Sequence, residues 1–162
     1  MEVKDLHHYS KDVDSDFKFF SDPATVEAKF AGLGARNIEL LESGASGSMH
    51  ITKIKREVPA EGIPALLRKF LGDWNKVVQT EKWRAQEGGV RRCELDVNIV
   101  NVPVSVVGTM TLRPEGSGCV NDVRINVTCG IPLVGKPLAE FVARNTKKNM
   151  DAEYAYIKGQ LA

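Results

Sequence analysis

The chain has 162 residues and a formal net charge of +1, from 22 Lys and Arg against 21 Asp and Glu. Hydrophobic residues make up 43% and charged residues 27%, as expected for a single globular domain with its own core. This charge balance argues against a nucleic-acid binder, which usually carries a basic face. No apolar run reaches the roughly 18 residues of a membrane helix, and the amino terminus lacks the apolar segment of a signal peptide. We therefore expect a cytoplasmic protein with no nucleic-acid partner and no integral membrane association.

The first third of the chain predicts a strand, two short helices and a strand hairpin. Residues 3–10 alternate between apolar and polar, as a half-buried strand does. Residues 13–34 carry two apolar stripes at helical spacing, which meet at Asp22-Pro23, a pair typical of a helix start. Residues 35–59 return to the strand pattern, with a turn expected at 44–47.

A short helix and four more strands are predicted in the middle of the chain. Apolar residues at helical spacing predict an amphipathic helix over 63–71, which would be either the wall of a cavity or a mobile lid. Strands are expected at 76–86, 90–101, 105–114 and 118–129. The Gly-rich and Pro-rich turns between them are short, so these strands form an antiparallel meander.

Two of these strands are apolar on one face only. Residues 93–99 alternate Cys, Leu, Val and Ile with polar partners, and residues 123–127 do the same with Val and Ile. This pattern is typical of an antiparallel sheet that is covered on one side. The only long element that remains follows Gly135-Lys136-Pro137, so we expect a C-terminal helix to cover the apolar face.

Several segments resemble the START-like, or polyketide-cyclase-like, superfamily, and within it a bacterial subfamily whose function is not established. These segments are "FSDPATVEAKFAGLGA", "VVQTEKWR", "VPVSVVGTMTLRPEGSGCVNDVRINVTCGIPLVGKPLAEFV" and "AEYAYI". The resemblance covers nearly the whole chain, and "IPLVGKPLAEFV" is its most specific part. It implies an α+β helix-grip fold, in which a curved seven-stranded antiparallel sheet wraps around the C-terminal helix and two short helices follow the first strand. It also implies one ligand-binding domain over residues 1–162 with an interior pocket, and no shared catalytic residues.

The C-terminal helix supplies three candidate ligand-binding residues. Phe141, Asn145 and Asn149 share one helical face with apolar neighbours. A buried amide without a partner costs roughly 1–3 kcal/mol, so water or a ligand in a cavity would have to satisfy both asparagines. The alternative is a helix rolled by about one position, with both asparagines in solvent.

The strand "VVQTEKWRA" supplies the other three candidates. Gln79, Glu81 and Trp83 share its inner face, where glutamine and glutamate are uncommon. Burial would raise the pKa of Glu81, which makes it a weak candidate for a general acid or a hydrogen-bond donor to a ligand. The alternatives are a solvated rim for both polar residues, a lysine partner for Glu81, and plain core packing for Trp83.

Metal and disulfide chemistry are not expected. His7 and His8 point to opposite faces of one strand, and His50 stands alone, so they cannot jointly bind an ion. The cysteines, at 93, 119 and 129, are odd in number and lack a CxxC spacing, which favours free thiols. No motif for a cofactor is present, so no cofactor is expected.

Three functions remain open at this stage. The first is binding of a hydrophobic or lipid-like small molecule in an interior cavity, for transport or sensing. The second is an enzyme of the cyclase, dehydratase or hydrolase type, using Glu81 with Asn145 or Asn149. The third is a protein-interaction module with a packed interior. An apolar cavity of roughly several hundred Å³ would favour the first, and a cavity into which Glu81 points would favour the second. A cavity volume near zero would favour the third.

Overall fold

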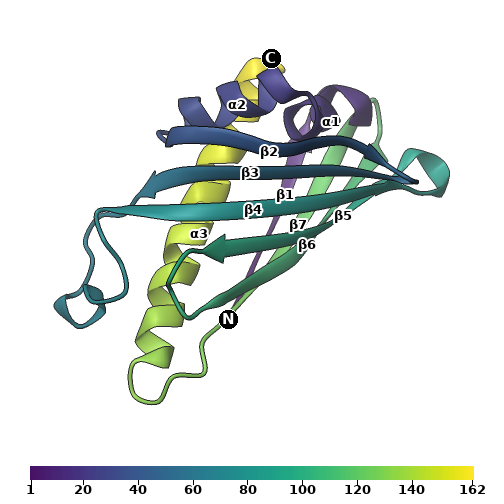
Figure 1. Cartoon of the computed structure of the whole chain (residues 1–162). Helices are drawn as coiled ribbons and strands as arrows, with labels where there is room; N and C mark the ends of the chain where they lie inside the picture. The colour runs from purple at the N-terminus through teal and green to yellow at the C-terminus, as the bar shows by residue number, and fades with distance from the viewer.

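The computed structural model describes residues 1–162 and contains one seven-stranded antiparallel sheet with three α-helices (Figure 1). The strands lie in the order β1-β7-β6-β5-β4-β3-β2. The elements along the chain are β1 (Glu2–Tyr9), α1 (Val13–Ser21), α2 (Pro23–Gly32), β2 (Arg36–Ser46), β3 (Met49–Pro59), β4 (Trp74–Ala85), β5 (Arg91–Ile99), β6 (Ser105–Glu115), β7 (Gly118–Thr128) and α3 (Gly135–Gln160). This order confirms the predicted helix-grip fold.

The two short helices begin where the sequence predicts. Asp12 caps α1 by accepting a hydrogen bond from the Ser15 amide, and Asp22 caps α2 in the same way from Thr25. Pro23 then occupies the first turn of α2, where its missing amide proton costs nothing. α1 and α2 lie together at one end of the sheet, beside the C-terminal end of α3 (Figure 1).

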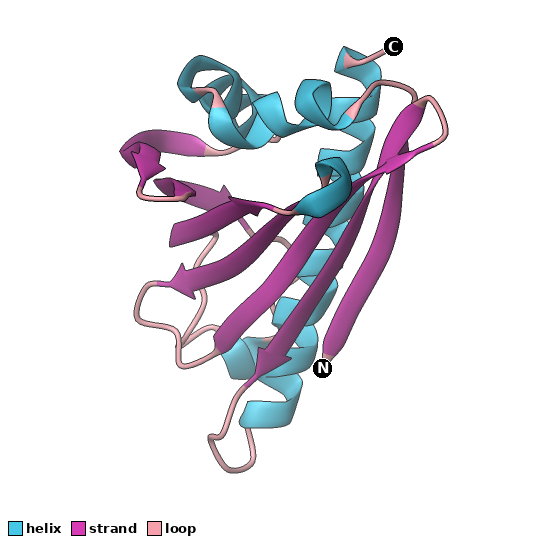
Figure 2. Cartoon of the chain, turned by 90° about the vertical axis from the view of Figure 1, so that its right-hand side faces the viewer, coloured by secondary structure: helices cyan, strands magenta, loops and turns pink.

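α3 lies along the concave side of the curved sheet (Figure 2). Leu138 near its start and Ile157 near its end are completely buried. Between them, Phe141 and Val142 join a core cluster that also takes inward residues of β5, β6 and β7. The prediction that α3 covers the apolar face is therefore confirmed.

The predicted amphipathic helix over 63–71 is wrong. The structure has only a single 3-10 turn, Ala65–Leu67, within an irregular loop between β3 and β4. An isolated helix of this length is only marginally stable in water. A backbone hydrogen bond from the Ala60 amide to the Asp73 carbonyl (2.9 Å) also joins the two ends of the loop. Three of the apolar residues still pack inward, since Ile63, Leu67 and Leu71 are buried in the core, whereas Leu66 is exposed.

The hairpin between β2 and β3 turns later than expected. The predicted turn at 44–47 is mostly strand, and the turn itself comes at Gly47-Ser48. Gly47 has a φ of 62°, which glycine adopts without strain. β2 also has two register shifts against β3, which bend this edge of the sheet. The remaining strand ends lie within about two residues of their predicted positions.

Candidate ligand-binding cavity

Two adjoining hollows lie between the concave face of the sheet and α3, with volumes of about 90 and 110 Å³. We call them the first and the second hollow, and together the interior cavity. Both are bordered by Arg56 of β3, Val97 of β5, Val106 of β6, and Thr146 and Asn149 of α3. A third hollow of about 50 Å³ lies beside α2 and shares two of those residues, Arg56 and Asn149. The three hollows therefore meet at one place.

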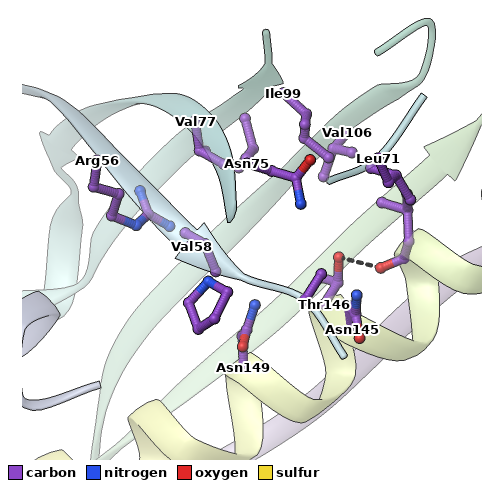
Figure 3. A pocket seen from close by; sticks show the side chains of 14 residues that line it. Arg56, Val58, Leu71, Asn75, Val77, Ile99, Val106, Asn145, Thr146 and Asn149 are labelled. Atoms are coloured by element: carbon purple, nitrogen blue, oxygen red, sulfur yellow. Dashed lines mark hydrogen bonds between the residues drawn. The ribbon is translucent and has the colours of Figure 1, made fainter. Parts of the chain in front are cut away.

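The first hollow is mainly apolar. Val77, Ile99 and Val142 are among its walls, and Leu71 of the loop over 63–71 closes part of it (Figure 3). This loop therefore serves as a wall in the structure. The hydroxyl of Thr146 is already engaged, because it donates to the Val142 carbonyl (2.8 Å).

A chain of hydrogen bonds runs from Arg56 at the cavity into the buried core along β4. Arg56 donates through Nη2 to Gln79 Oε1 (2.9 Å), and Gln79 Nε2 donates to Glu81 Oε2 (2.7 Å). Trp83 Nε1 donates to the other oxygen, Glu81 Oε1 (2.9 Å). The amide of Gln79 is therefore oriented by a cation on one side and a carboxylate on the other.

Glu81 lies behind the cavity and not in it. The residue is buried, both of its oxygens accept hydrogen bonds, and it borders none of the three hollows, whereas Gln79 borders the second. Burial raises the pKa of Glu81, while the charge of Lys29 and the bonds from Trp83 and Gln79 oppose that rise. Trp83 is also buried, against the rings of Phe17 and Phe20.

The two asparagines of α3 lie at the rim of the cavity. Asn145 is half-buried and borders the first hollow, and Asn149 is exposed and borders all three. Neither amide has a hydrogen-bond partner within the protein, so both are free to bind water or a ligand. Since Asn149 is at once exposed and part of the wall, the cavity opens to solvent beside it. Phe141 is buried in the core and borders neither hollow.

Arg56 is a cavity residue that the sequence interpretation did not single out. It belongs to "TKIKREV", in which Ile54, Arg56 and Val58 alternate with outward residues. A period of two therefore placed an arginine on the inner face and could have identified it. Burial lowers the pKa of Arg56 to about 10, so it stays charged at neutral pH. Its guanidinium packs on the ring of Phe30 (4.2 Å).

His7 and Asn121 form a second polar spot, at the wall of the second hollow. They are direct partners in the β1–β7 register, and both are buried. His7 Nε2 and Asn121 Oδ1 have no hydrogen-bond partner in the protein. Burial lowers the pKa of His7, which favours the neutral ring. A water molecule or a polar group of a ligand would satisfy this pair.

A further charged cluster lies under α1 and α2. Lys29 is completely buried, 3.4 Å from Glu153 Oε1, with its ammonium over the rings of Phe20 (4.2 Å) and Phe30 (4.6 Å). Asp16 is also completely buried, and neither of its oxygens has a partner. No three His, Cys, Asp or Glu side chains in the chain are arranged to hold a metal ion.

The fold is shared with several solved structures, each of low sequence identity. TTHA0849 from Thermus thermophilus is 16% identical with a TM-score of 0.64, over 99% of this chain and 97% of that one. A STAR-related lipid transfer protein from Xanthomonas axonopodis is 14% identical with a TM-score of 0.60, over 97% and 85%. The human StAR-related lipid transfer protein 5 is 10% identical with a TM-score of 0.61, over 99% and 74%. At these identities the likeness shows the fold alone.

Three further findings concern the chain as a whole. None of its helices combines the length and the apolar character needed to cross a membrane. No curated protein matches it by sequence. The family described as "Protein of unknown function (DUF2505)" matches residues 6–161, which is almost the entire chain. This match shows that the chain belongs to the DUF2505 family, and its seven-stranded sheet around a long C-terminal helix is the helix-grip fold.

Proposed function

We propose that residues 1–162 act as one START-like domain that binds a hydrophobic or lipid-like small molecule in the interior cavity. The observation that carries this proposal is the pair of adjoining hollows left between the sheet and α3, of which the first is mainly apolar and the second mixes apolar and polar walls. Protein cores are usually packed without such spaces, and ligand pockets combine apolar walls with a few polar groups. The lipid-transfer names of two structural neighbours agree with this proposal and do not establish it.

The six residues expected from the sequence take different parts in this proposal. Gln79, Asn145 and Asn149 border the cavity and would contact the ligand. Glu81, Trp83 and Phe141 would support that wall from the core.

The size of the cavity limits the ligand. Pockets for drug-sized molecules usually measure about 300–1,000 Å³, and each hollow is smaller than that. The cavity would therefore enclose a small molecule or one end of a longer one. The opening beside Asn149 would let the rest of a longer ligand reach solvent.

The position of Glu81 favours binding over acid catalysis by that residue. A general acid must come within hydrogen-bond reach of the substrate. Both oxygens of Glu81 are already engaged by Gln79 and Trp83, and the carboxyl group borders no hollow. The unfilled cavity likewise favours a ligand-binding protein over an interaction module with a packed interior.

A matched pair of variants tests the proposal. Val106 points into the cavity and is buried, whereas its neighbour Val107 faces outward and is 42% exposed. Val106→Phe should fill the hollows and lower the affinity for a fluorescent fatty-acid probe by at least about tenfold, while Val107→Phe should leave it unchanged. Native mass spectrometry of the protein purified from cells should show a retained small molecule that Val106→Phe lacks. Unchanged probe binding by a folded Val106→Phe protein would contradict the proposal.

A further inference from the structure

Arg56 is a half-buried cation that forms no salt bridge within the protein. Its one side-chain hydrogen bond goes to the neutral amide of Gln79, and Nη1 is shielded from solvent without any acceptor. The carboxylates nearby already have partners, since Glu81 accepts from Gln79 and Trp83 and Glu153 pairs with Lys29. Shielding part of a charged group from water is costly unless an opposite charge or hydrogen bonds compensate it, and Nη1 has neither water nor an acceptor.

Arg56 also stands where the three hollows meet. Only Arg56 and Asn149 border all of them, Arg56 from the sheet and Asn149 from α3. Figure 3 shows both side chains reaching into the opening between these two elements. The amide of Asn149 has no partner in the protein and can donate to the same acceptor. A guanidinium and a free amide therefore lie together at the mouth of the cavity, beside the mainly apolar first hollow.

We propose that the ligand is a carboxylic acid, bound as the carboxylate by Arg56 and Asn149 with its apolar tail in the interior cavity. This rests on the proposed function and adds the head group to it. A planar guanidinium matches a carboxylate with two parallel hydrogen bonds, and such charge-assisted bonds are about twice as strong as neutral ones. Val77, Ile99 and Val142 of the first hollow supply the apolar surface for the tail.

The charges around Arg56 favour a head group with one negative charge. Glu153 borders the second and the third hollow, so a doubly charged phosphate would lie against a carboxylate. A cationic head group would in turn be repelled by Arg56. The carboxylate is the compact head group that fits both conditions.

A series of ligands with one tail and three head groups tests this proposal on the wild-type protein. Calorimetric titration with octanoate, octanol and octylamine compares an anion, a neutral group and a cation. We expect octanoate to bind at least about tenfold more tightly than octanol, and octylamine to bind most weakly. Equal affinities for octanoate and octanol would overturn the carboxylate assignment while leaving the proposed function intact. Failure of all three, and of the fatty-acid probe, would overturn the proposed function itself.

Variants of Arg56 then test whether its guanidinium binds the carboxylate of the ligand. Arg56→Gln should abolish the preference for octanoate and keep octanol affinity within about threefold, whereas Arg56→Lys should keep part of the preference. Lys55→Gln, at the preceding residue of β3, removes the same charge from a side chain that borders none of the three hollows, and should keep the full preference. A preference that survives Arg56→Gln, or that Lys55→Gln also removes, would overturn the proposal. The wild-type series decides the question even where a variant does not fold.

Discussion

The carboxyl group of Asp16 makes the stability of this protein depend on pH. Asp16 lies on α1, is completely buried, and has no hydrogen-bond partner for either oxygen. Burial raises the pKa of Asp16 from 3.8 to about 7; the nearby charge of Lys29 opposes the rise and that of Glu153 adds to it. Since the folded pKa lies above the unfolded one, this group contributes stability that is fully present below about pH 4 and is lost as pH rises through 7.

The size of the effect follows from that difference. From about pH 5 to the folded pKa of about 7 there are roughly two pH units, each worth about 1.4 kcal/mol. The wild-type free energy of unfolding should therefore fall by roughly 3 kcal/mol between about pH 5 and about pH 8 through Asp16 alone. For a domain of this size that loss lowers Tm by about 6–12 °C.

Replacing the carboxyl group by an amide should remove this loss. In urea denaturation at about pH 5 and about pH 8, Asp16→Asn should lack roughly 3 kcal/mol of the wild-type change, because an amide does not titrate. The comparison concerns the change with pH, so any fixed cost of burying the amide cancels. Asp14→Asn, on the same helix with its side chain 80% exposed, is the matched control and should keep the wild-type change. Equal pH dependence of Asp16→Asn and the wild type would refute the reasoning.

The remaining predictions concern the cavity rim and the thiols. Asn145→Leu should weaken binding of a fluorescent fatty-acid probe with equal or higher Tm, because this half-buried amide has no partner in the fold to lose; a lower Tm with unchanged probe binding would contradict its place at the cavity. Thiol titration should find all three cysteines reactive in denaturant, since all are free. In the native protein the half-buried Cys129 should react first, because burial raises the pKa of Cys119 to about 12 and raises that of Cys93 further; native Cys93 reacting as fast as Cys129 would contradict this burial.

Local sequence patterns predicted the secondary structure correctly wherever a single pattern, such as a helix cap or a two-residue alternation, applied to a segment. The cap at Asp22-Pro23 and the two-residue alternation of β5 and β7 each predicted the observed structure. Over 63–71 two rules competed. The apolar spacing favoured a helix, but a short loop tied at both ends to neighbouring strands buries Ile63, Leu67 and Leu71 with a single 3-10 turn.

In the candidate site, such local patterns predicted which side chains face inward but not which of them bond to one another. Alternation placed Gln79, Glu81 and Trp83 on one inner face, and all three are buried there. It did not show that Gln79 and Trp83 saturate Glu81 and leave it behind the wall of the cavity. Side chains on one strand are separated by fixed steps, but the path of a hydrogen bond depends on rotamers and on the partner that the next strand presents.

The sheet, the two capped helices and the covering helix could be predicted from the chain, because each rests on periodicity and capping within a few residues. Which polar groups meet depends on long-range packing. Arg56 of β3 and Asn149 of α3 are far apart in sequence and share the mouth of the cavity because the sheet curves around α3. Likewise, the burial of Asp16 and Lys29 depends on how α1 and α2 close over one end of the sheet, a long-range packing that no local pattern encodes.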